Sequence, residues 1–288
     1  HILVDEIDGV KVITIRRPQV MNATNGEMDK EMLAVLKEGQ NDPKVKGFVI
    51  TGYGIQAFSA GRDIGEFPKV LGNAEASAQY ARDASRLLYF IDQINKPVVA
   101  AVNGMALGGG FEITLRCHSM VATKNAAFQF PEITLGILPG IGGCIVPYRR
   151  WPASAETFHE MLCLGRRISA QEAADIGMVK KLTDNYLDMV KAAVEEVNKL
   201  QGKVERIPDG KVDIPEVKLP EKPMAGKLAL SKEAVSVVVK TIKDGAAAAS
   251  FKDALEIGYR GFGEIACTDA AKEGISAFME KRQSEFKK

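Results

Sequence analysis

The feature of this sequence that most constrains its fold is an apolar run followed closely by a cluster of glycines. Residues 97–102 (PVVAAV) have the composition of a buried strand, and three consecutive glycines at 108–110 precede a helix-like segment that begins at Glu112. Glycine lets a ligand approach the backbone closely because no Cβ stands in the way. The N–H groups of a helix's first turn favour negative charge. The stretch therefore predicts chemistry in which an oxyanion develops while the Glu112 carboxylate moves a proton.

Strand-like and helix-like segments alternate along most of the chain. Two β-rich runs flank Asp8-Gly9, a dipeptide typical of hairpins, and Ser169 with Glu172 fits a capping box at a helix start. We expect short strands over residues 47–51, 97–102, 119–123 and 127–130, and helices over residues 25–36, 76–94, 154–164 and 169–176. This order predicts an α/β core.

Composition limits the function classes. The chain has 288 residues, 46% of them hydrophobic, and a net charge of +1, which gives no global reason to bind nucleic acid or an anionic membrane. No apolar run approaches the ~20 residues that span a bilayer. Four scattered cysteines and three isolated histidines form no metal-binding pattern and favour a reducing, cytoplasmic setting. The chain opens with His1 rather than Met, so we expect the native start to lie upstream. We also expect no signal peptide before the first strand-like run.

The composition changes after about residue 200. Residues 1–200 carry the alternating pattern of the core, whereas residues 201–226 hold four prolines among alternating charges and no sustained apolar period. We interpret that segment as a linker or surface excursion. Residues 227–288 return to an Ala-rich, amphipathic helical composition.

Two short motifs offer other chemistries. GYGIQA at residues 52–57 has the glycines of a dinucleotide fingerprint but continues as a loop instead of opening a helix, so we reject that interpretation. AFSAG at residues 57–61 resembles the nucleophile elbow of hydrolases, and a nucleophilic Ser59 would need His118 or His159. A tight turn made of small residues explains the second motif with fewer assumptions.

A second acidic residue stands in an unusual context. Glu132 follows a strand-like run and a proline, and it leads into a glycine-rich, otherwise apolar segment that ends at residue 143. An isolated glutamate is usually solvated surface. Beside an anion site that already has Glu112, however, two carboxylates in different environments can divide the acid and base roles.

Taken together, these motifs resemble the crotonase, or enoyl-CoA hydratase/isomerase, superfamily. The resemblance lies in AFSAGRDI at residues 57–64, in residues 103–112, and in the segment 131–143. It continues in GRRISA at residues 165–170 and in the closing segment 269–282, and it covers nearly the whole chain except roughly residues 200–230. The resemblance implies a core spiral of ββα turns, with a helical C-terminal region through which subunits form trimers or hexamers.

The resemblance also implies an activity and the residues that perform it. Members bind acyl-CoA thioesters and stabilise an enolate with two backbone N–H groups, which match Arg62 and Gly109. In hydratases two glutamates act, so Glu112 would activate the water that adds at Cβ, and Glu132 would deliver the proton to Cα. No metal and no cofactor beyond the CoA of the substrate is implied. The positions that match substrate contacts are Ala60, Gly140, Phe278 and Lys281.

Some residues depart from the family pattern, and several alternatives remain open. Gln56 and Gly65 stand where many members carry basic residues, and Cys144 stands where Thr or Ser is common. The main prediction is a short-chain enoyl-CoA hydratase. An enoyl-CoA isomerase, a hydratase part of a dehydrogenase fusion, a Ser59 hydrolase and a non-catalytic acyl-CoA-binding or RNA-binding relative are the alternatives.

Overall fold

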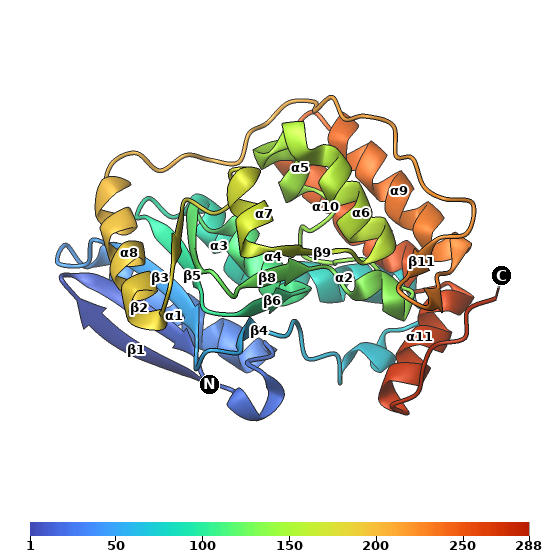
Figure 1. Ribbon diagram of the computed structural model, residues 1–288, viewed down its shortest axis with the longest axis horizontal. Coiled ribbons are helices and arrows are strands. Elements are labelled where there is room, and N and C mark those ends of the chain that lie inside the picture. The colour runs from blue at the N-terminus through green and yellow to red at the C-terminus, as the bar shows by residue number, and fades with distance from the viewer. Residues whose placement is uncertain (288) are drawn as a thin grey trace. The chain divides into compact units, whose positions relative to one another are not determined.

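The computed structural model describes residues 1–287, which form two compact units. The first unit contains His1–Asp63, Arg86–Phe128 and Ile168–Arg206. The second contains Ile64–Ser85, Gln129–Arg167 and the chain from Ile207 onward. Each unit is therefore assembled from segments that are far apart in the sequence (Figure 1).

A six-stranded sheet forms the centre of the first unit. Its order is β1-β2-β3-β5-β7-β10, with β1 antiparallel to β2 and all other neighbours parallel. The strands are β1 (Ile2–Ile7), β2 (Val10–Ile15), β3 (Gly47–Gly52), β5 (Val98–Val102), β7 (Ser119–Thr123) and β10 (Lys181–Thr183). The predicted hairpin is confirmed: Asp8 and Gly9 both have positive φ, as a two-residue turn between twisted strands requires.

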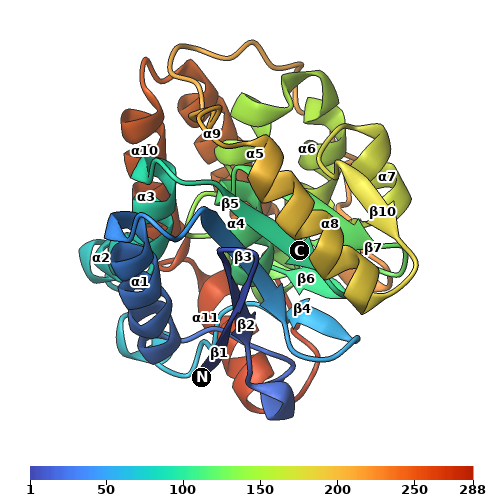
Figure 2. The same cartoon turned by 90° about the vertical axis from the view of Figure 1, so that its left-hand side faces the viewer.

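One face of this sheet packs against helix α8 (Tyr186–Lys199), which crosses it in Figure 2. Alternate strand residues face the helix because successive side chains of a strand point to opposite sides. The contacting side chains are all buried and aliphatic or methionine: Val10, Val12, Val49, Val99, Ala101 and Val121 from the strands, and Met189, Val190, Ala193, Val194 and Val197 from α8. This layer fixes the parallel strands whose carboxyl ends lead into the candidate site.

A second sheet has the order β4-β6-β8-β9. Its strands are β4 (Ala57–Ser59), β6 (Met105–Leu107), β8 (Ala127–Gln129) and β9 (Arg167–Ser169). The chain runs from β3 to β4, from β5 to β6 and from β7 to β8, and each pair is followed by helical structure. This repeated strand–strand–helix order is the ββα spiral that the resemblance implied. The expectation that residues 58–61 continue as a loop is wrong in part, because β4 extends through Ser59.

Side-chain caps set the starts of several helices in the first unit. Asn25 accepts a hydrogen bond from the Met28 N–H and begins α1 (Gly26–Asn41). The predicted capping box of Ser169 and Glu172 is confirmed at α7 (Ala170–Asp175). The remaining helices of this unit are η1 (Pro18–Val20), α3 (Arg86–Gln93) and α4 (Gly109–Arg116).

The prediction of one continuous helix over residues 76–94 is wrong. The structure has α2 (Ala74–Ala84) and then α3, separated at Ser85. The Ser85 hydroxyl donates to the Ala81 carbonyl, 2.9 Å away, and its N–H also bonds within the last turn of α2. A serine that satisfies the backbone in this way competes with continuation of the helix.

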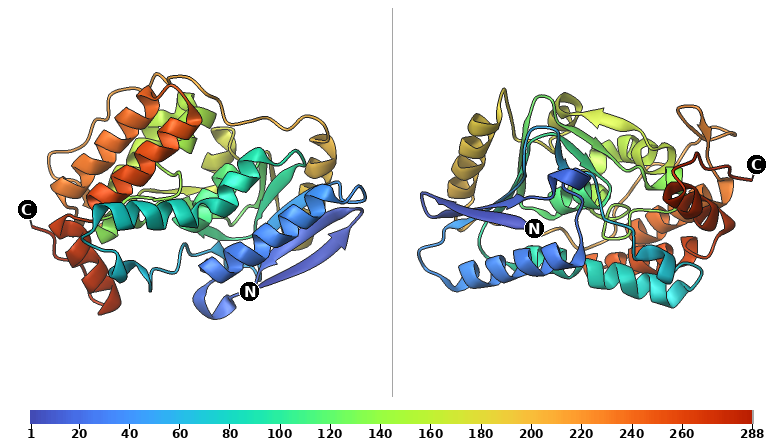
Figure 3. Two further views of the ribbon diagram at one scale, coloured as in Figure 1. Left: turned by 180° about the vertical axis from the view of Figure 1, so that it is seen from behind. Right: turned by 90° about the horizontal axis from the view of Figure 1, so that it is seen from below.

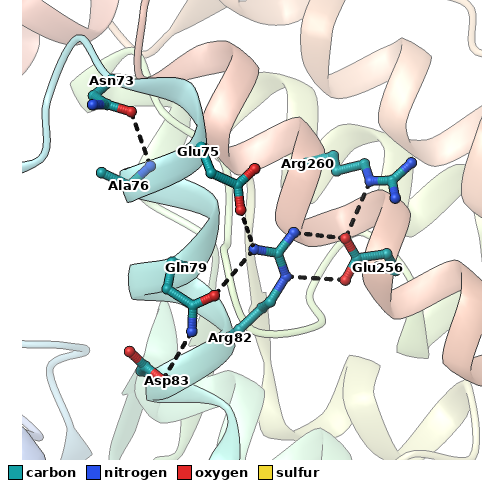
Figure 4. A network of polar contacts seen from close by, with 8 residues as sticks. All are labelled: Asn73, Glu75, Ala76, Gln79, Arg82, Asp83, Glu256 and Arg260. Carbon is teal, nitrogen blue, oxygen red and sulfur yellow. Dashed lines mark hydrogen bonds and ion pairs between the residues drawn. The ribbon is translucent and has the colours of Figure 1, made fainter.

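The second unit is mainly helical. Its helices are η2 (Phe67–Lys69), α2, η3 (Glu132–Leu135), α5 (Val146–Arg150), η4 (Pro152–Ser154), α6 (Ala155–Leu164), α9 (Lys232–Ala247), α10 (Phe251–Ile265) and α11 (Asp269–Met279). Helices α9 and α10 run side by side (Figure 3), and α2 packs on α10. Arg82 of α2 makes a two-pronged ion pair with Glu256 of α10, with N–O distances of 3.1 and 2.6 Å (Figure 4).

The proline-rich excursion lies between α8 and α9. Within the described chain, residues 200–223 contain no helix or strand, and a small hairpin of β11 (Met224–Ala225) and β12 (Leu228–Ala229) follows. The buried guanidinium of Arg149 donates to the carbonyls of Pro208 and Gly210 at 2.9 and 2.8 Å. These hydrogen bonds fix the middle of the excursion on its own unit.

Among residues 1–287, no helix combines the length and the hydropathy needed to cross a membrane.

Candidate active site

Two buried asparagines hold the loop that leads from β3 into β4. Asn103, directly after β5, accepts from the Gly52 N–H (3.0 Å) and donates to the carbonyls of Gly54 (2.8 Å) and Ala57 (3.1 Å). Asn22, whose φ is 58°, also donates to the Ala57 carbonyl at 2.8 Å. Asn103 begins the 103–112 motif of the resemblance, and no role was predicted for the side chain of either asparagine. Both asparagine side chains hold the backbone of residues 52–57, which leads directly into the segment that carries Ala60 and Arg62.

The glycine cluster forms the start of α4, and the structure shows why these positions lack side chains. Gly108 has φ 48° as the residue before the helix. A Cβ on Gly110 would lie 2.5 Å from the Ser59 Cβ, so β4 and α4 could not approach. A Cβ on Gly109 would lie 3.3 Å from the backbone N of Arg62. The backbone of Gly109 is thus adjacent to the amide of Arg62. These are the two positions predicted to supply the backbone N–H donors, and the structure places them next to each other.

The segment around Arg62 is held on both sides by backbone hydrogen bonds. The Thr24 N–H donates to the Gly61 carbonyl at 2.9 Å, and the Asp63 N–H donates to the Thr24 carbonyl at 2.8 Å, forming an isolated bridge. The Ala60 N–H donates to the Met21 carbonyl at 3.0 Å. These bonds leave the backbone from Ala60 to Asp63 with little freedom, as a preorganised hydrogen-bond donor requires.

The side chain of Arg62 points to helix α1 and pairs with Asp29 at 2.7 Å. Both side chains are mostly buried. Burial raises the pKa of Asp29, and the guanidinium of Arg62 opposes that rise. The pair anchors the Arg62 segment to α1. The sequence predicted a role for the Arg62 amide alone and none for Asp29, because an acidic residue in the first turn of a helix is ordinarily explained by the helix dipole.

Glu112 lies one helical turn after Gly109 and is only 2% exposed. The helix begins at Gly109 rather than at Glu112, so the glutamate sits inside the first turn and its own N–H donates to the Gly108 carbonyl at 2.9 Å. The neighbouring Phe111 packs on Phe128 with ring centroids 5.2 Å apart. A carboxylate buried to this extent has the environment of an acid–base group rather than of a solvated surface residue.

Glu132 opens the short helix η3, which follows Pro131. Its side chain is half-buried. Helix α11 packs directly on η3: a Cβ on Gly274 would collide with the carbonyl of Leu135, and Gly136, with φ 67°, lies against the backbone of Ala270. The 3-10 turn that carries Glu132 is therefore held by the C-terminal helix.

Three predicted substrate contacts belong to the second unit. Gly140 is half-buried, and a Cβ there would lie 2.8 Å from the ring of Phe262. Phe262 packs on Phe67 with ring centroids 5.1 Å apart. Phe278 is 51% exposed near the end of α11, and Lys281 follows it with φ 56°. The structure thus places Gly140 against the ring of Phe262 and leaves Phe278 at the surface.

The predicted site residues fall into two groups of four. The first unit holds Ala60, Arg62, Gly109 and Glu112, and the second holds Glu132, Gly140, Phe278 and Lys281. Within the first group, the backbone contacts given above bring Arg62, Gly109 and Glu112 to one helix start.

The surroundings of Ser59 do not suit a nucleophile. Ser59 is fully buried, and its Oγ accepts from the Gly61 N–H at 3.2 Å. Of its candidate partners, His118 accepts from the Val98 N–H through Nδ1 at 2.9 Å. The motif is a tight turn of small residues that allows β4 to pack on α4.

No group of three or more His, Cys, Asp or Glu side chains in the described part of the chain could hold a metal ion.

The fold is that of an α/β protein built of ββα repeats. At the start of α4 it has a buried glutamate, Glu112, close to the adjoining backbones of Arg62 and Gly109. The pattern of the enoyl-CoA hydratase/isomerase family matches residues 5–208. The chain is 32% identical over 285 residues to a short-chain-enoyl-CoA hydratase of Clostridium acetobutylicum, covering 99% of this chain and 97% of the relative. It is equally identical over 287 residues to a crotonyl-CoA hydratase of Syntrophomonas wolfei, with the same coverage.

Solved structures agree with the sequence relatives. A carnitinyl-CoA hydratase from Mycobacterium avium superposes with a TM-score of 0.70 at 26% identity, covering 99% of this chain and 98% of that one. The chain belongs to the enoyl-CoA hydratase/isomerase family.

Proposed function

We propose that this protein is an enoyl-CoA hydratase, which adds water to a trans-2-enoyl-CoA and gives a 3-hydroxyacyl-CoA. One observation carries the proposal: Glu112 is buried one helical turn after Gly109, and the backbone of Gly109 adjoins the amide of Arg62. The near full-length likeness to proteins described as short-chain-enoyl-CoA and crotonyl-CoA hydratases supports the same activity.

In this proposal the backbone stabilises the negative charge of the intermediate. Addition of water at Cβ pushes the π electrons of the conjugated thioester onto its carbonyl oxygen. The N–H groups of Arg62 and Gly109 donate to that oxygen. Loss of one such donor costs about 2.7–4 kcal/mol in other enzymes. The hydrogen-bonded backbone from Ala60 to Asp63 supports the role, since the donor is already oriented before the substrate binds.

Two carboxylates move the protons. Glu112 takes a proton from the attacking water as the new C–O bond forms at Cβ. Glu132 donates its proton to Cα as the enolate collapses, and both carboxyl groups then return to their starting states by proton exchange. Acid and base help of this kind contributes about 10²–10⁴-fold each. No metal or cofactor takes part beyond the CoA of the substrate.

Binding of the CoA and acyl parts is assigned to four further residues. The Ala60 carbonyl meets the adenine, Gly140 lines the acyl site, and Phe278 and Lys281 reach CoA from a neighbouring subunit of a trimer or hexamer. The exposure of Phe278 and Met279, at 51% and 54%, supports an interface at the end of α11. We propose a cytoplasmic protein that acts in fatty-acid breakdown.

Turnover of isomeric substrates tests the proposal. The purified protein is assayed with trans-2-enoyl-CoA thioesters of several chain lengths and with the corresponding trans-3-enoyl-CoA thioesters, which report isomerisation. Hydration of the 2-enoyl series at a rate well above isomerisation is expected. Turnover of the 3-enoyl series alone would mean that the protein is an isomerase, a reaction that one carboxylate can perform.

A further inference from the structure

Residues 60–63 are held along one edge by the segment that precedes helix α1. The Thr24 N–H donates to the Gly61 carbonyl, and the Asp63 N–H donates to the Thr24 carbonyl. Thr24 and Arg62 therefore lie opposite each other in a parallel bridge. Because the Gly61–Arg62 peptide is trans, its N–H points away from its carbonyl and so away from Thr24. The bond from Thr24 thus sets the direction of the Arg62 N–H, which is a proposed donor to the substrate.

Hydrogen bonds along one edge leave one motion of the segment open. A segment attached only at its edge can tilt about the line of those bonds, and a tilt changes the direction of its N–H groups. In an extended segment the side chains stand out of the plane of the hydrogen bonds. A contact made by the Arg62 side chain therefore attaches the segment at a point off that line, and it opposes the tilt.

Asp29 makes this contact. Its Oδ2 accepts from Arg62 Nη1 at 2.7 Å, and the side chains of Asp29 and Arg62 are 15% and 17% exposed. A second ion pair of the same segment, between Arg17 and Asp63, is longer at 3.4 Å, and the Asp63 side chain is 45% exposed. Exposed ion pairs contribute little, whereas a short charge-assisted hydrogen bond is strong and directional. The pair with Asp29 is therefore the stronger restraint.

The two anchors of the Arg62 segment are fixed relative to each other. Thr24 directly precedes Asn25, whose side chain caps α1 by accepting from the Met28 N–H. The Asn25 carbonyl accepts from the Asp29 N–H at 3.0 Å. The start of α1 thus joins the backbone anchor, Thr24, to the side-chain anchor, Asp29.

We propose that Asp29 is a positioning residue for hydration: through the Arg62 side chain it holds the Gly61–Arg62 peptide in the orientation in which the N–H donates to the thioester oxygen. The inference rests on the proposed function, in which that N–H is one of two donors. Hydrogen bonds to a charged oxygen are roughly twice as strong as those to a neutral one. A misaligned donor therefore destabilises the enolate-like transition state more than the bound substrate.

The variant Asp29→Asn tests the inference, since it removes the charge that holds the guanidinium and keeps the size of the side chain. Complete loss of such a donor lowers kcat by about 10²–10³-fold, so we expect a tilted donor to lower it on the order of 10-fold. KM should change by less than about threefold. Asp29→Glu keeps the carboxylate and should restore kcat to within about threefold of the wild type. The matched control is Glu256→Gln, which breaks an Arg–carboxylate pair of the second unit and should leave kcat unchanged.

An infrared measurement reports on the donor itself. Butyryl-CoA with an isotopic label at its carbonyl carbon is a saturated thioester that cannot be hydrated, and hydrogen-bond donors lower the stretching frequency of its carbonyl. In the complex with Asp29→Asn that frequency should be higher than in the wild-type complex. A loss of stability alone, with the site intact in the folded protein, would not change it.

A double variant tests whether Asp29 acts through the side chain of Arg62. Arg62→Met removes the guanidinium and keeps the backbone N–H, so it should lower kcat at least as much as Asp29→Asn. The double variant Asp29→Asn with Arg62→Met should then lose no more than Arg62→Met alone, because the interaction is already absent. Losses that multiply in the double variant would overturn the inference.

The outcomes separate this inference from the proposed function. If the wild type does not hydrate trans-2-enoyl-CoA, or Glu112→Gln hydrates it normally, the proposed function is wrong. If both of those controls behave as expected while folded Asp29→Asn retains the wild-type kcat and carbonyl frequency, the role of Asp29 is wrong. Should Asp29→Asn fail to fold, the double variant decides, because it removes both charges of the pair. Wild-type kcat in the double variant then overturns the inference, and a lowered kcat with a raised carbonyl frequency supports it.

Discussion

The substitution Gly109→Ala probes the two amides directly. A Cβ at this position would lie 3.3 Å from both the backbone N and the Cβ of Arg62, slightly closer than ordinary van der Waals contact. The neighbouring backbone must therefore move by a few tenths of an ångström, and the methyl group would press against the amide nitrogen of Arg62. Because one donor is displaced, we expect kcat to fall by about 10²–10³-fold, which corresponds to ~2.7–4 kcal/mol of transition-state stabilisation.

The stability of this variant should change little. Replacing glycine by alanine in a compatible backbone stabilises by about 0.4–1 kcal/mol, which offsets mild crowding. Gly26 provides the matched control, because it is the first residue of α1 as Gly109 is the first residue of α4, and a Cβ there meets nothing within 4 Å. Steady-state kinetics with a trans-2-enoyl-CoA and thermal melting are measured for both variants. Full activity of folded Gly109→Ala would refute the role of these amides.

Three other predictions concern the second unit. Gly274→Ala would force α11 away from the Leu135 carbonyl and should lower the free energy of unfolding by about 1–3 kcal/mol, as measured by denaturation. Burial raises the pKa of Cys163 to about 12, so iodoacetamide at pH 8 should label the exposed Cys267 and spare Cys163, as mass spectrometry would show. The guanidinium of Arg82 donates to Glu256 and lowers the pKa of that carboxyl. We therefore expect Glu256→Gln to lower the free energy of unfolding by about 1 kcal/mol or less at neutral pH. The difference in melting temperature between the wild type and Glu256→Gln should shrink once the pH falls below the ordinary glutamate pKa. It should vanish when the pH has passed below the lowered pKa of Glu256 in the folded protein.

Much of the fold could be predicted from local patterns. The Asp8-Gly9 hairpin and the Ser169–Glu172 capping box are each encoded within a few residues, and the structure has both. The break at Ser85 could not be predicted from periodicity, because the apolar spacing continues from α2 into α3. The deciding interaction is the hydrogen bond of the Ser85 hydroxyl to the preceding turn. The three-residue strands β4 and β6 are too short to show a period of their own.

The candidate site was predictable where its residues sit in continuous motifs. The glycine cluster and Glu112 lie within a few residues of each other, and the structure places them at one helix start. The supporting residues were not predictable, because their partners are distant in sequence. Arg62 and Asp29 are 33 residues apart, and an arginine or aspartate is ordinarily solvated. Only the tertiary fold brings the Arg62 segment against α1.

The hydration rate of the Glu112→Gln variant tests the central claim most directly. Glutamine keeps the size of the side chain but cannot take a proton from water, so the account predicts a folded protein that binds trans-2-enoyl-CoA and hydrates it at least about 10²-fold more slowly than the wild type. Glu132→Gln, measured in parallel, should show a loss of similar size. Hydration by folded Glu112→Gln at the wild-type rate would contradict the account.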